Sequence, residues 1–386
     1  MKEFKPVYYY KGWAKYNEEL SGDKVKCCST PDSFILVLSD GLGSGVKANI
    51  LATLTTEIFL TMFEEGIPLP DILETVLKTL PICEERKIAY STFTVIQVFK
   101  NGEVRVVNFD NPDPIFVSNG SILRIPSEEQ TIHGKKLKLW KFRVIGRTYI
   151  YTFSDGVLYA GLEKLLDLGW GYENISDYLI KATRKYDDLK YVVDNIMDIV
   201  FNYYDGQPGD DATLAGIYIR EKKKLVIFTG PPLNKENDEQ VVKLFLSEEG
   251  EKIICGGTTS NIVSRYVNKE VKMDLSTMRS DVPPFGELEG VGLVTEGVLT
   301  LSKTLELLEK CNGDKTKIPK DDKNAAVMLA KKLLEADECK FIFGQSINSV
   351  YQNPDLPIDI SIRKNIIEKL ANILSKYEKT IEVIKV

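Results

Sequence analysis

Residues 33–45 are Ser-Phe-Ile-Leu-Val-Leu-Ser-Asp-Gly-Leu-Gly-Ser-Gly, an apolar run that ends in an acidic, glycine-rich turn. The stretch 33–38 has the apolar character of a buried strand, and a helical pattern follows over 46–63. The turn therefore joins a strand to a helix. We expect Asp40 at the end of this strand, where the glycines leave room for a ligand.

The segments that follow this helix are rich in β-branched and aromatic residues and are separated by turn dipeptides such as Asn101-Gly102. They predict an antiparallel meander with strands over 91–99, 103–109, 114–118 and 147–153. Three helices and a closing strand are predicted next, over 157–168, 174–187, 189–204 and 212–220. Strands in a block flanked by helices favour packed sheets covered by helices over a Rossmann alternation.

After the basic turn at 221–224 the pattern changes to strands and helices in alternation. The predicted strands cover 225–230, 253–257, 270–275, 290–297, 340–345 and 380–386, and the predicted helices cover 236–247, 259–267, 298–310, 322–336 and 361–377. This alternation is typical of a parallel, Rossmann-like α/β domain. A chain of 386 residues also exceeds the size at which one core stops growing. We expect two domains, 1–222 and 223–386, of α/β and α+β class.

Composition limits the partners that this chain can bind. Its net charge is -6 and its pI is near 5.3, so it lacks the basic excess that grips phosphate backbones. We expect a protein or small-molecule partner and no nucleic acid. Residues 1–15 contain no apolar signal-peptide core, and the most hydrophobic helix candidate, 46–63, carries threonines and Glu57. The expectation is a cytoplasmic protein without a membrane span.

The chain has one histidine, His133, and six cysteines that show no C-x-x-C spacing. A Ser-His-Asp triad, a Cys-His pair or a multi-histidine zinc site would all need this single histidine. Because His133 falls in a predicted turn, we expect it at the surface. Hydrolytic chemistry should instead rest on carboxylates and on hard metal ions that prefer oxygen ligands.

Acidic residues occur at or beside strand ends throughout the first half of the chain. They are Asp23 in Ser-Gly-Asp, Asp40 in the turn quoted above, Asp155 in Ser-Asp-Gly, and Asp210 in Gly-Asp-Asp-Ala-Thr. Each motif alone is more typical of an ordinary turn, since Asp-Gly is a common turn dipeptide. Together they supply the several carboxylates that a pair of divalent ions about 3.5–4 Å apart requires.

This set of motifs resembles the metal-dependent protein phosphatases, the type 2C or PPM family, and within them the bacterial SpoIIE-like branch. The hallmarks of that branch are S-G-D, S-D-G-x-G-x-G-x-x-A, a later S-D-G and a final D-D-x-T. They correspond here to residues 21–23, 39–48, 154–156 and 210–213. The resemblance covers residues 1 to about 220. It implies an αββα phosphatase sandwich, followed here by the Rossmann-like domain.

The resemblance also implies a mechanism and a role for each acidic residue. Asp40 would bridge two Mn²⁺ or Mg²⁺ ions, the Gly41 carbonyl would bind one of them, and Asp155 and Asp210 would bind the other. Asp23 would act at the metal centre, directly or through bound water, and Asp211 occupies the position after the last ligand. Hydroxide activated by the two ions would attack phosphorus directly. Asp23 and Asp40 are thus the expected catalytic residues.

The substrate that the resemblance suggests is phosphoserine or phosphothreonine on a regulatory protein, one candidate being an antagonist of an anti-sigma factor. One loop departs from the family pattern: residues 108–114 lack the glycine and histidine of the N-A-G-H-x-P found in many relatives. Three alternatives stay open. They are a catalytically weak relative that only binds a phosphoprotein, a small-molecule phosphohydrolase, and a protein whose main function lies in the second domain.

The second domain contains a glycine and hydroxyl cluster, Cys255-Gly256-Gly257-Thr258-Thr259-Ser260, between a predicted strand and a predicted helix. Backbone N–H groups at such a helix start favour an anion. The loops at 295–297 and 344–346 are expected at the same edge of the sheet. We therefore consider a small anionic ligand, against the alternative of a plain turn with Thr258 or Thr259 as N-cap.

Overall fold

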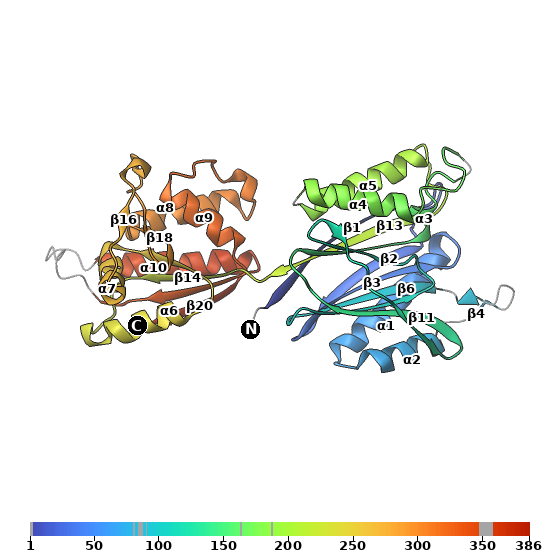
Figure 1. The fold of residues 1–386 in the computed structure, drawn as a ribbon, viewed down its shortest axis with the longest axis horizontal. Coiled ribbons are helices and arrows are strands. Elements are labelled where there is room, and N and C mark those ends of the chain that lie inside the picture. The colour runs from blue at the N-terminus through green and yellow to red at the C-terminus, as the bar shows by residue number, and fades with distance from the viewer. Residues whose placement is uncertain are drawn as a thin grey trace. The chain divides into compact units, whose positions relative to one another are not determined.

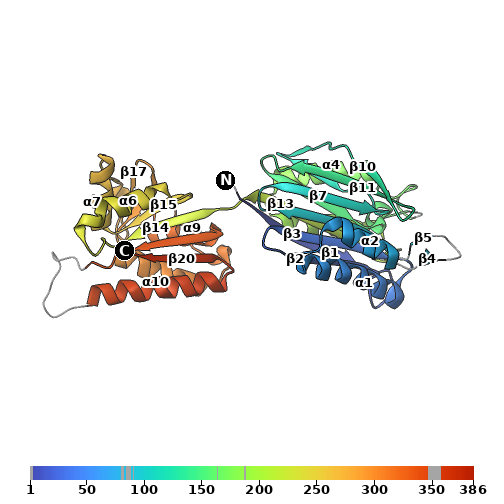
Figure 2. The ribbon, with the colours of Figure 1, turned by 90° about the horizontal axis from the view of Figure 1, so that it is seen from below.

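The computed structural model describes residues 3–79, 82–83, 88–89, 91–162, 164–186, 188–346 and 358–386. The chain divides into two compact units, Met1–Glu221 and Lys222–Val386. Figures 1 and 2 show each unit as its own set of sheets and covering helices. The functional roles expected for domains 1–222 and 223–386 stay predictions.

Two antiparallel sheets form the centre of the first unit. One sheet has the order β1-β13-β12-β8-β9, with bounds Phe4–Trp13, Ala212–Glu221, Thr148–Phe153, Ile115–Ser118 and Ser121–Ile122. The other has the order β10-β11-β7-β6-β3-β2, with bounds Glu128–Ile132, Lys135–Arg143, Glu103–Phe109, Ser91–Phe99, Ser33–Gly41 and Asp23–Ser29. A separate small pair joins β4 (Ile82–Cys83) and β5 (Ile88–Ala89).

Helices cover the outer face of each sheet in this unit (Figure 1). The helices are α1 (Gly45–Glu64), α2 (Leu69–Thr79), α3 (Asp155–Leu158), α4 (Tyr172–Lys185) and α5 (Leu189–Tyr203). One core cluster packs α1 and α2 on the second sheet, a second packs α4 and α5 on the first sheet, and a third lies between the sheets. The unit is therefore an αββα sandwich, as expected.

Helix α1 has the length and apolar composition of a membrane-spanning helix. Its inner face nevertheless packs in this core, where Ala48, Ala52 and Phe59 are fully buried. The apolar character of this helix thus has an explanation in the packing of the sandwich.

The second unit contains five parallel strands in the order β18-β15-β14-β19-β20, extended at one edge by antiparallel β17 and β16. Their bounds are Val291–Thr295, Glu251–Cys255, Lys224–Thr229, Glu338–Phe343, Thr380–Lys385, Gly286–Leu288 and Lys272–Met273. Numbered along the chain, the parallel strands follow the order 3-2-1-4-5 of a doubly wound sheet.

Helices cover both faces of this parallel sheet (Figure 2). One face carries α6 (Asp238–Ser247) and α7 (Gly257–Val267). The other carries α8 (Val298–Cys311), α9 (Ala325–Glu335) and α10 (Ile358–Lys376). Three short 3₁₀ helices, η1 (Lys235–Asn237), η2 (Leu275–Thr277) and η3 (Lys315–Lys317), lie in the connections.

Two predicted elements are much shorter than expected. The helix predicted over 157–168 ends at Leu158, because Gly161 and Gly169 adopt positive φ values of 82° and 74°. The strand predicted over 270–275 is reduced to Lys272–Met273. Asp274 ends it by accepting a hydrogen bond from the Ser276 N–H, which begins η2.

Candidate active site

Asp23 and Asp40 lie directly opposite each other on neighbouring strands. Asp23 begins β2, Asp40 stands one residue before the end of β3, and the two are paired in the antiparallel register. The Gly41 N–H donates to the Gly22 carbonyl at 3.1 Å, which continues the pairing into the turn. Directly opposed residues have neighbouring side chains, so this pair places two carboxylates together.

Asp155, Asp210 and Asp211 come from the other sheet. Asp155 follows β12 and begins α3, while Asp210 and Asp211 directly precede β13. A Cβ on Gly156 would stand only 2.1 Å from the Asp211 carbonyl oxygen. The turn after β12 and the turn before β13 are therefore in close contact, and this contact requires glycine at position 156.

Ser154 joins the two halves of the cluster. Its hydroxyl donates to Asp23 Oδ2 at 2.7 Å and accepts from the Thr213 N–H at 2.9 Å. Asp23 belongs to one sheet, whereas Ser154 and Thr213 belong to the other. The hydroxyl thus fixes the position of Asp23 relative to the carboxylates of the opposite sheet. The sequence motif Ser-Asp-Gly contained this serine, but sequence reasoning gave it no role.

Burial and mutual repulsion hold these carboxyl groups towards their protonated forms. Burial, followed by the charges of Asp23, Asp155, Asp210 and Asp211, raises the pKa of Asp40 to about 9. Burial also raises the pKa of Asp23 to about 7, against the hydrogen bond from Ser154. The pKa values of Asp155 and Asp210 are raised, again first by burial. All the predicted acidic residues therefore lie in one electrostatic cluster.

Two oxygen atoms of this cluster are buried without a hydrogen-bond partner in the described residues, Asp23 Oδ1 and Asp211 Oδ2. Asp211 Oδ2 and the Gly41 carbonyl oxygen lie 2.8 and 3.6 Å from the position of a Cβ on Gly22, so they face the same space. Unpartnered buried oxygens and an all-oxygen donor set suit a hard divalent cation.

The carboxylate side chains of the cluster do not converge on one point. Within the described ranges, no three His, Cys, Asp or Glu side chains are positioned to hold a metal ion. A cation approaches the cluster: Lys15 Nζ lies 3.9 Å from Asp210 Oδ1. Negative charges this close together repel each other, so the carboxylates are expected to turn apart when no cation neutralises them.

The first strand contributes to the cluster in a way that the sequence analysis missed. β1 pairs with β13 so that Trp13 stands opposite Ala212, which brings Lys15 beside the acidic turn. The Lys15 N–H donates to Asp211 Oδ1 at 3.0 Å. The aromatic run Tyr8-Tyr9-Tyr10 is typical of a strand and was the available signal.

The loop that departs from the family pattern is held by asparagines. Asn108 Nδ2 donates to the Asn111 carbonyl at 2.8 Å, and Asn111 Nδ2 donates to Thr94 Oγ1 at 3.1 Å. Thr92, which stands opposite Asp40 in the sheet, donates to Asn111 Oδ1. This network connects the loop to the acidic cluster without the glycine and histidine of the relatives.

His133 takes no part in the cluster. It is exposed in the turn between β10 and β11, with a positive φ of 49°, and its Nε2 lies 3.5 Å from Glu74 Oε1. The expectation of a surface turn residue is confirmed, and imidazole chemistry at the acidic cluster is excluded for this chain.

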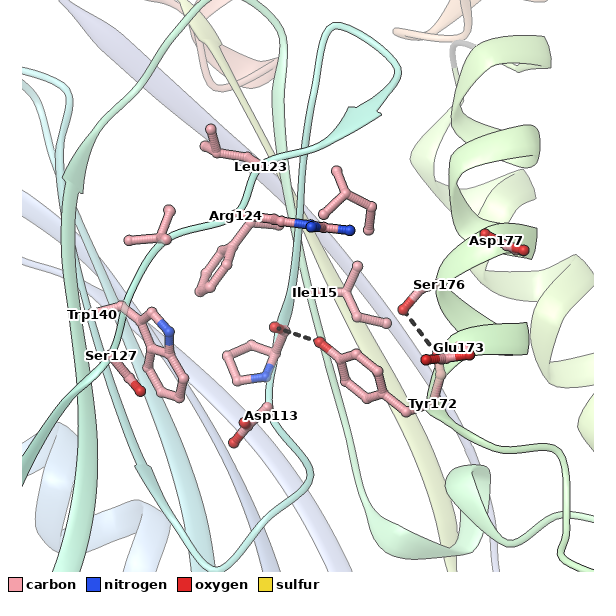
Figure 3. Close-up of a pocket in the computed structure, with 14 residues that line it drawn as sticks. Asp113, Ile115, Leu123, Arg124, Ser127, Trp140, Tyr172, Glu173, Ser176 and Asp177 are labelled. Carbon is pink, nitrogen blue, oxygen red and sulfur yellow. Dashed lines mark hydrogen bonds between the residues drawn. The ribbon is translucent and has the colours of Figure 1, made fainter.

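A cavity of about 510 Å³ borders the loop 108–114 at Asp113 and Pro114 (Figure 3). Tyr172 closes part of it by donating to the Pro114 carbonyl at 3.3 Å, and its ring packs 6.3 Å from that of Phe153, the residue before Ser154. Figure 3 shows Arg124 reaching across the cavity towards α4, which carries Asp177. The cavity therefore combines apolar walls with charges of both signs.

Comparison with known proteins gives one family and several structures. The family model described as Stage II sporulation protein E (SpoIIE) matches residues 30–220. This range contains Asp40, Asp155, Asp210 and Asp211 and begins after Asp23. No curated protein sequence matches the chain.

Three similar solved structures illustrate the range of likeness. The PP2C phosphatase domain with a fragment of the regulatory domain of SpoIIE from Bacillus subtilis is 16% identical with a TM-score of 0.49; the match covers 58% of this chain and 65% of that one. RsbX in complex with magnesium is 15% identical with a TM-score of 0.40, over 57% and 100% of the two chains. The catalytic domain of the phosphatase PstP with 2 manganese ions is 11% identical with a TM-score of 0.39, over 56% and 99%.

Proposed function

Because the N-terminal unit of this chain belongs to the SpoIIE family, we propose that it is a metal-dependent phosphatase that removes phosphate from phosphoserine or phosphothreonine on a regulatory protein. The observation that carries the proposal is the cluster of Asp23, Asp40, Asp155, Asp210 and Asp211, whose charges act on one another from two sheets. Two members of the cluster retain buried, unpartnered oxygens.

In this proposal Asp40, the Gly41 carbonyl, Asp155 and Asp210 hold two Mn²⁺ or Mg²⁺ ions, and Asp211 supplies its unpartnered Oδ2. When bound, such ions neutralise phosphate charge and lower the pKa of water so that a nucleophile exists at neutral pH. The carboxylates must rotate towards the ions, since they do not converge as placed.

The chain's own residues hold the members of the acidic cluster in position. Ser154 fixes Asp23 through Oδ2, so Asp23 Oδ1 stays directed into the cluster as an acceptor for water. Gly22 and Gly156 allow the turns that contain them to lie close to Asp211, because a Cβ at either position would collide with Asp211. His133 is exposed elsewhere, so proton transfer in this proposal does not use imidazole and is assigned to carboxyl groups or water.

In this proposal the cavity that borders the loop 108–114 contacts the polypeptide next to the phosphorylated residue. Its volume of about 510 Å³ has room for a short peptide segment, and its lining offers Trp140 and Arg124 for such contacts. A phosphorylated regulatory protein fits this requirement, and an antagonist of an anti-sigma factor is one such protein.

A second candidate is a catalytically weak phosphoprotein-binding regulator. The observation that favours it is the lack of three converging ligands among the described residues. The two functions differ in turnover, since a pure binder would retain the phosphopeptide without releasing phosphate.

The test is phosphate release from phosphoserine and phosphothreonine peptides and from an aryl phosphate, with Mn²⁺, with Mg²⁺ and with EDTA. We expect activity only with a divalent ion and its near-complete loss in Asp40→Asn and Asp155→Asn. Asp198→Asn is the matched control, because Asp198 is 62% exposed and lies outside the cluster. Full activity in both cluster variants would refute the proposed ligands, and metal-independent binding without turnover would favour the second candidate.

A further inference from the structure

The starts of α7 and α8 lie against each other in the second unit. The Gly256 N–H donates to the Thr295 carbonyl at 2.8 Å, and a Cβ on Gly297 would stand 3.5 Å from Gly256 Cα. Both helices begin at the carboxyl ends of neighbouring parallel strands, β15 and β18. Doubly wound sheets bind their ligands at this edge.

The start of α7 is open to an approaching anion. Its N-cap is Gly256, with φ 134°, no side-chain cap and no acidic residue in the first turn. The N-cap is therefore neither Thr258 nor Thr259, and this part of the plain-turn alternative is wrong. Gly257 is exposed, and no atom of the described residues lies within 4 Å of the position that its Cβ would take. N–H groups and the helix dipole at such a start favour negative charge.

A buried hydroxyl at the same place gives an independent indication. Thr259 is 1% exposed, and its Oγ1 has no hydrogen-bond partner among the residues that the structure describes. This oxygen lies 3.4 Å from the Cβ position of Gly256, so it faces the helix start. A buried hydroxyl is normally hydrogen-bonded, and a ligand oxygen at the helix start would complete its bonding.

The neighbouring helix shows a different arrangement. Thr300, the third residue of α8, is fully buried and its Oγ1 also has no partner in the described part of the chain. There, however, Glu296 Oε2 accepts from the Leu299 N–H at 3.2 Å. The start of α8 thus has a carboxylate of its own, and the first turn of α7 is the one left for an external anion.

A positive charge lies at the same edge of the sheet. Arg363 of α10 reaches the end of β14, where its Nη1 lies 3.0 Å from the Cβ position of Gly230. Its Nε is buried without a partner in the described ranges. The end of β14 is tied to that of β15 by the Thr229 hydroxyl, which donates to the Cys255 carbonyl at 2.8 Å.

We propose that the carboxyl edge of this sheet binds the phosphate group of a small molecule at the first turn of α7. The N–H groups of Gly257 and Thr259 and the Thr259 hydroxyl donate to the phosphate oxygens, and Arg363 of α10 provides positive potential from beside the end of β14. The site is separate from the acidic cluster, since it needs no metal ion and lies in the other unit.

The test is calorimetric titration of the full chain in EDTA, which removes metal-dependent binding at the acidic cluster. The probes are inorganic phosphate, AMP and ribose 5-phosphate, with adenosine and ribose as unphosphorylated controls. We expect saturable binding of phosphorylated probes only. Equal affinity for inorganic phosphate and AMP assigns the site to free phosphate, whereas tighter binding of an ester assigns it to a phosphorylated metabolite.

Two variants test the location. Gly257→Asp fits the open space and places a carboxylate where the phosphate would bind, so affinity should fall by about tenfold or more relative to the isosteric Gly257→Asn. Thr259→Val should weaken binding without lowering the melting temperature, because it removes a hydroxyl that has no hydrogen-bond partner within the described part of the chain. Equal affinity in the Asp and Asn variants would overturn the site, as would the absence of binding by all phosphorylated probes or capture of a phosphoserine peptide alone.

Discussion

Ser154→Ala tests whether the two halves of the acidic cluster are joined as the structure indicates. The substitution removes the hydroxyl that donates to Asp23 Oδ2 and accepts from the Thr213 N–H. Both partners are buried, Asp23 at 6% and Thr213 at 4% exposure. Asp23 Oδ1 has no hydrogen-bond partner among the described residues, so the loss of the Ser154 hydroxyl leaves this buried carboxyl with less hydrogen bonding still.

The magnitude follows from the groups left unpaired. A buried polar group without its partner costs about 1–3 kcal/mol, so two such groups lower the free energy of unfolding by about 2–6 kcal/mol. For a unit of this size, that corresponds to a fall in melting temperature on the order of 10 °C. Phosphatase activity should fall as well, since Asp23 would no longer be fixed.

Tryptophan fluorescence during urea unfolding can follow the N-terminal unit within the full chain, because all 3 tryptophans, Trp13, Trp140 and Trp170, lie in it. The matched control is Thr152→Val. Thr152 lies two residues earlier on β12, and its Oγ1 is buried without a described partner, so removing it should be neutral or slightly stabilising. Equal stability changes in the two variants would refute the role of Ser154.

Three further predictions follow from the same cluster. The pKa in the folded chain is about 7 for Asp23 and about 9 for Asp40, against an ordinary 3.8, so the folded chain holds protons that the unfolded chain has released. The free energy of unfolding in EDTA should therefore fall as the pH rises from about 4 to about 9. A urea midpoint that rises or stays constant over this range would contradict the prediction. Mn²⁺ should raise the midpoint more at pH 8.5 than at pH 6, measured by the same fluorescence, because it replaces protons as the source of positive charge. Gly156→Ala should lower metal-dependent activity strongly, because its Cβ would stand 2.1 Å from the Asp211 carbonyl oxygen; activity equal to the wild type would show that the turns separate without consequence.

The sequence predicted those parts of the fold in which local pattern and tertiary packing agree. The strands over 91–99 and 103–109 are found with the same bounds, and the helix expected over 46–63 spans Gly45–Glu64. In these segments β-branched runs and apolar periodicity coincide with burial. The alternation after residue 224 likewise produced the parallel sheet.

Other elements depend on contacts that a sequence pattern does not contain. β1 exists because its residues pair with β13, about two hundred positions away, and its local signal was limited to an aromatic run at 8–10. The acidic motifs marked the cluster residues, but not the bridge through Ser154 or the contact from Lys15. The Ser154 bond joins the two sheets, and the Lys15 bond joins the ends of β1 and β13, which are far apart in the sequence, so the geometry of both is set only when the chain folds.

The environment of the acidic residues separates a functional cluster from ordinary turns. An aspartate that only stabilises a turn accepts local N–H groups and stays in contact with water, which costs the fold nothing. Asp23 is instead buried to 6% exposure, with one oxygen unpartnered and its pKa raised to about 7, and Asp40 stands opposite it with a pKa raised to about 9. Such crowding opposes folding, and only a cation that binds the folded chain would reverse its sign. Two results together would refute metal-dependent catalysis: no stabilisation of the wild type by Mn²⁺, and a higher stability of Asp40→Asn than of the wild type in EDTA. The cluster would then destabilise the fold without binding a cation.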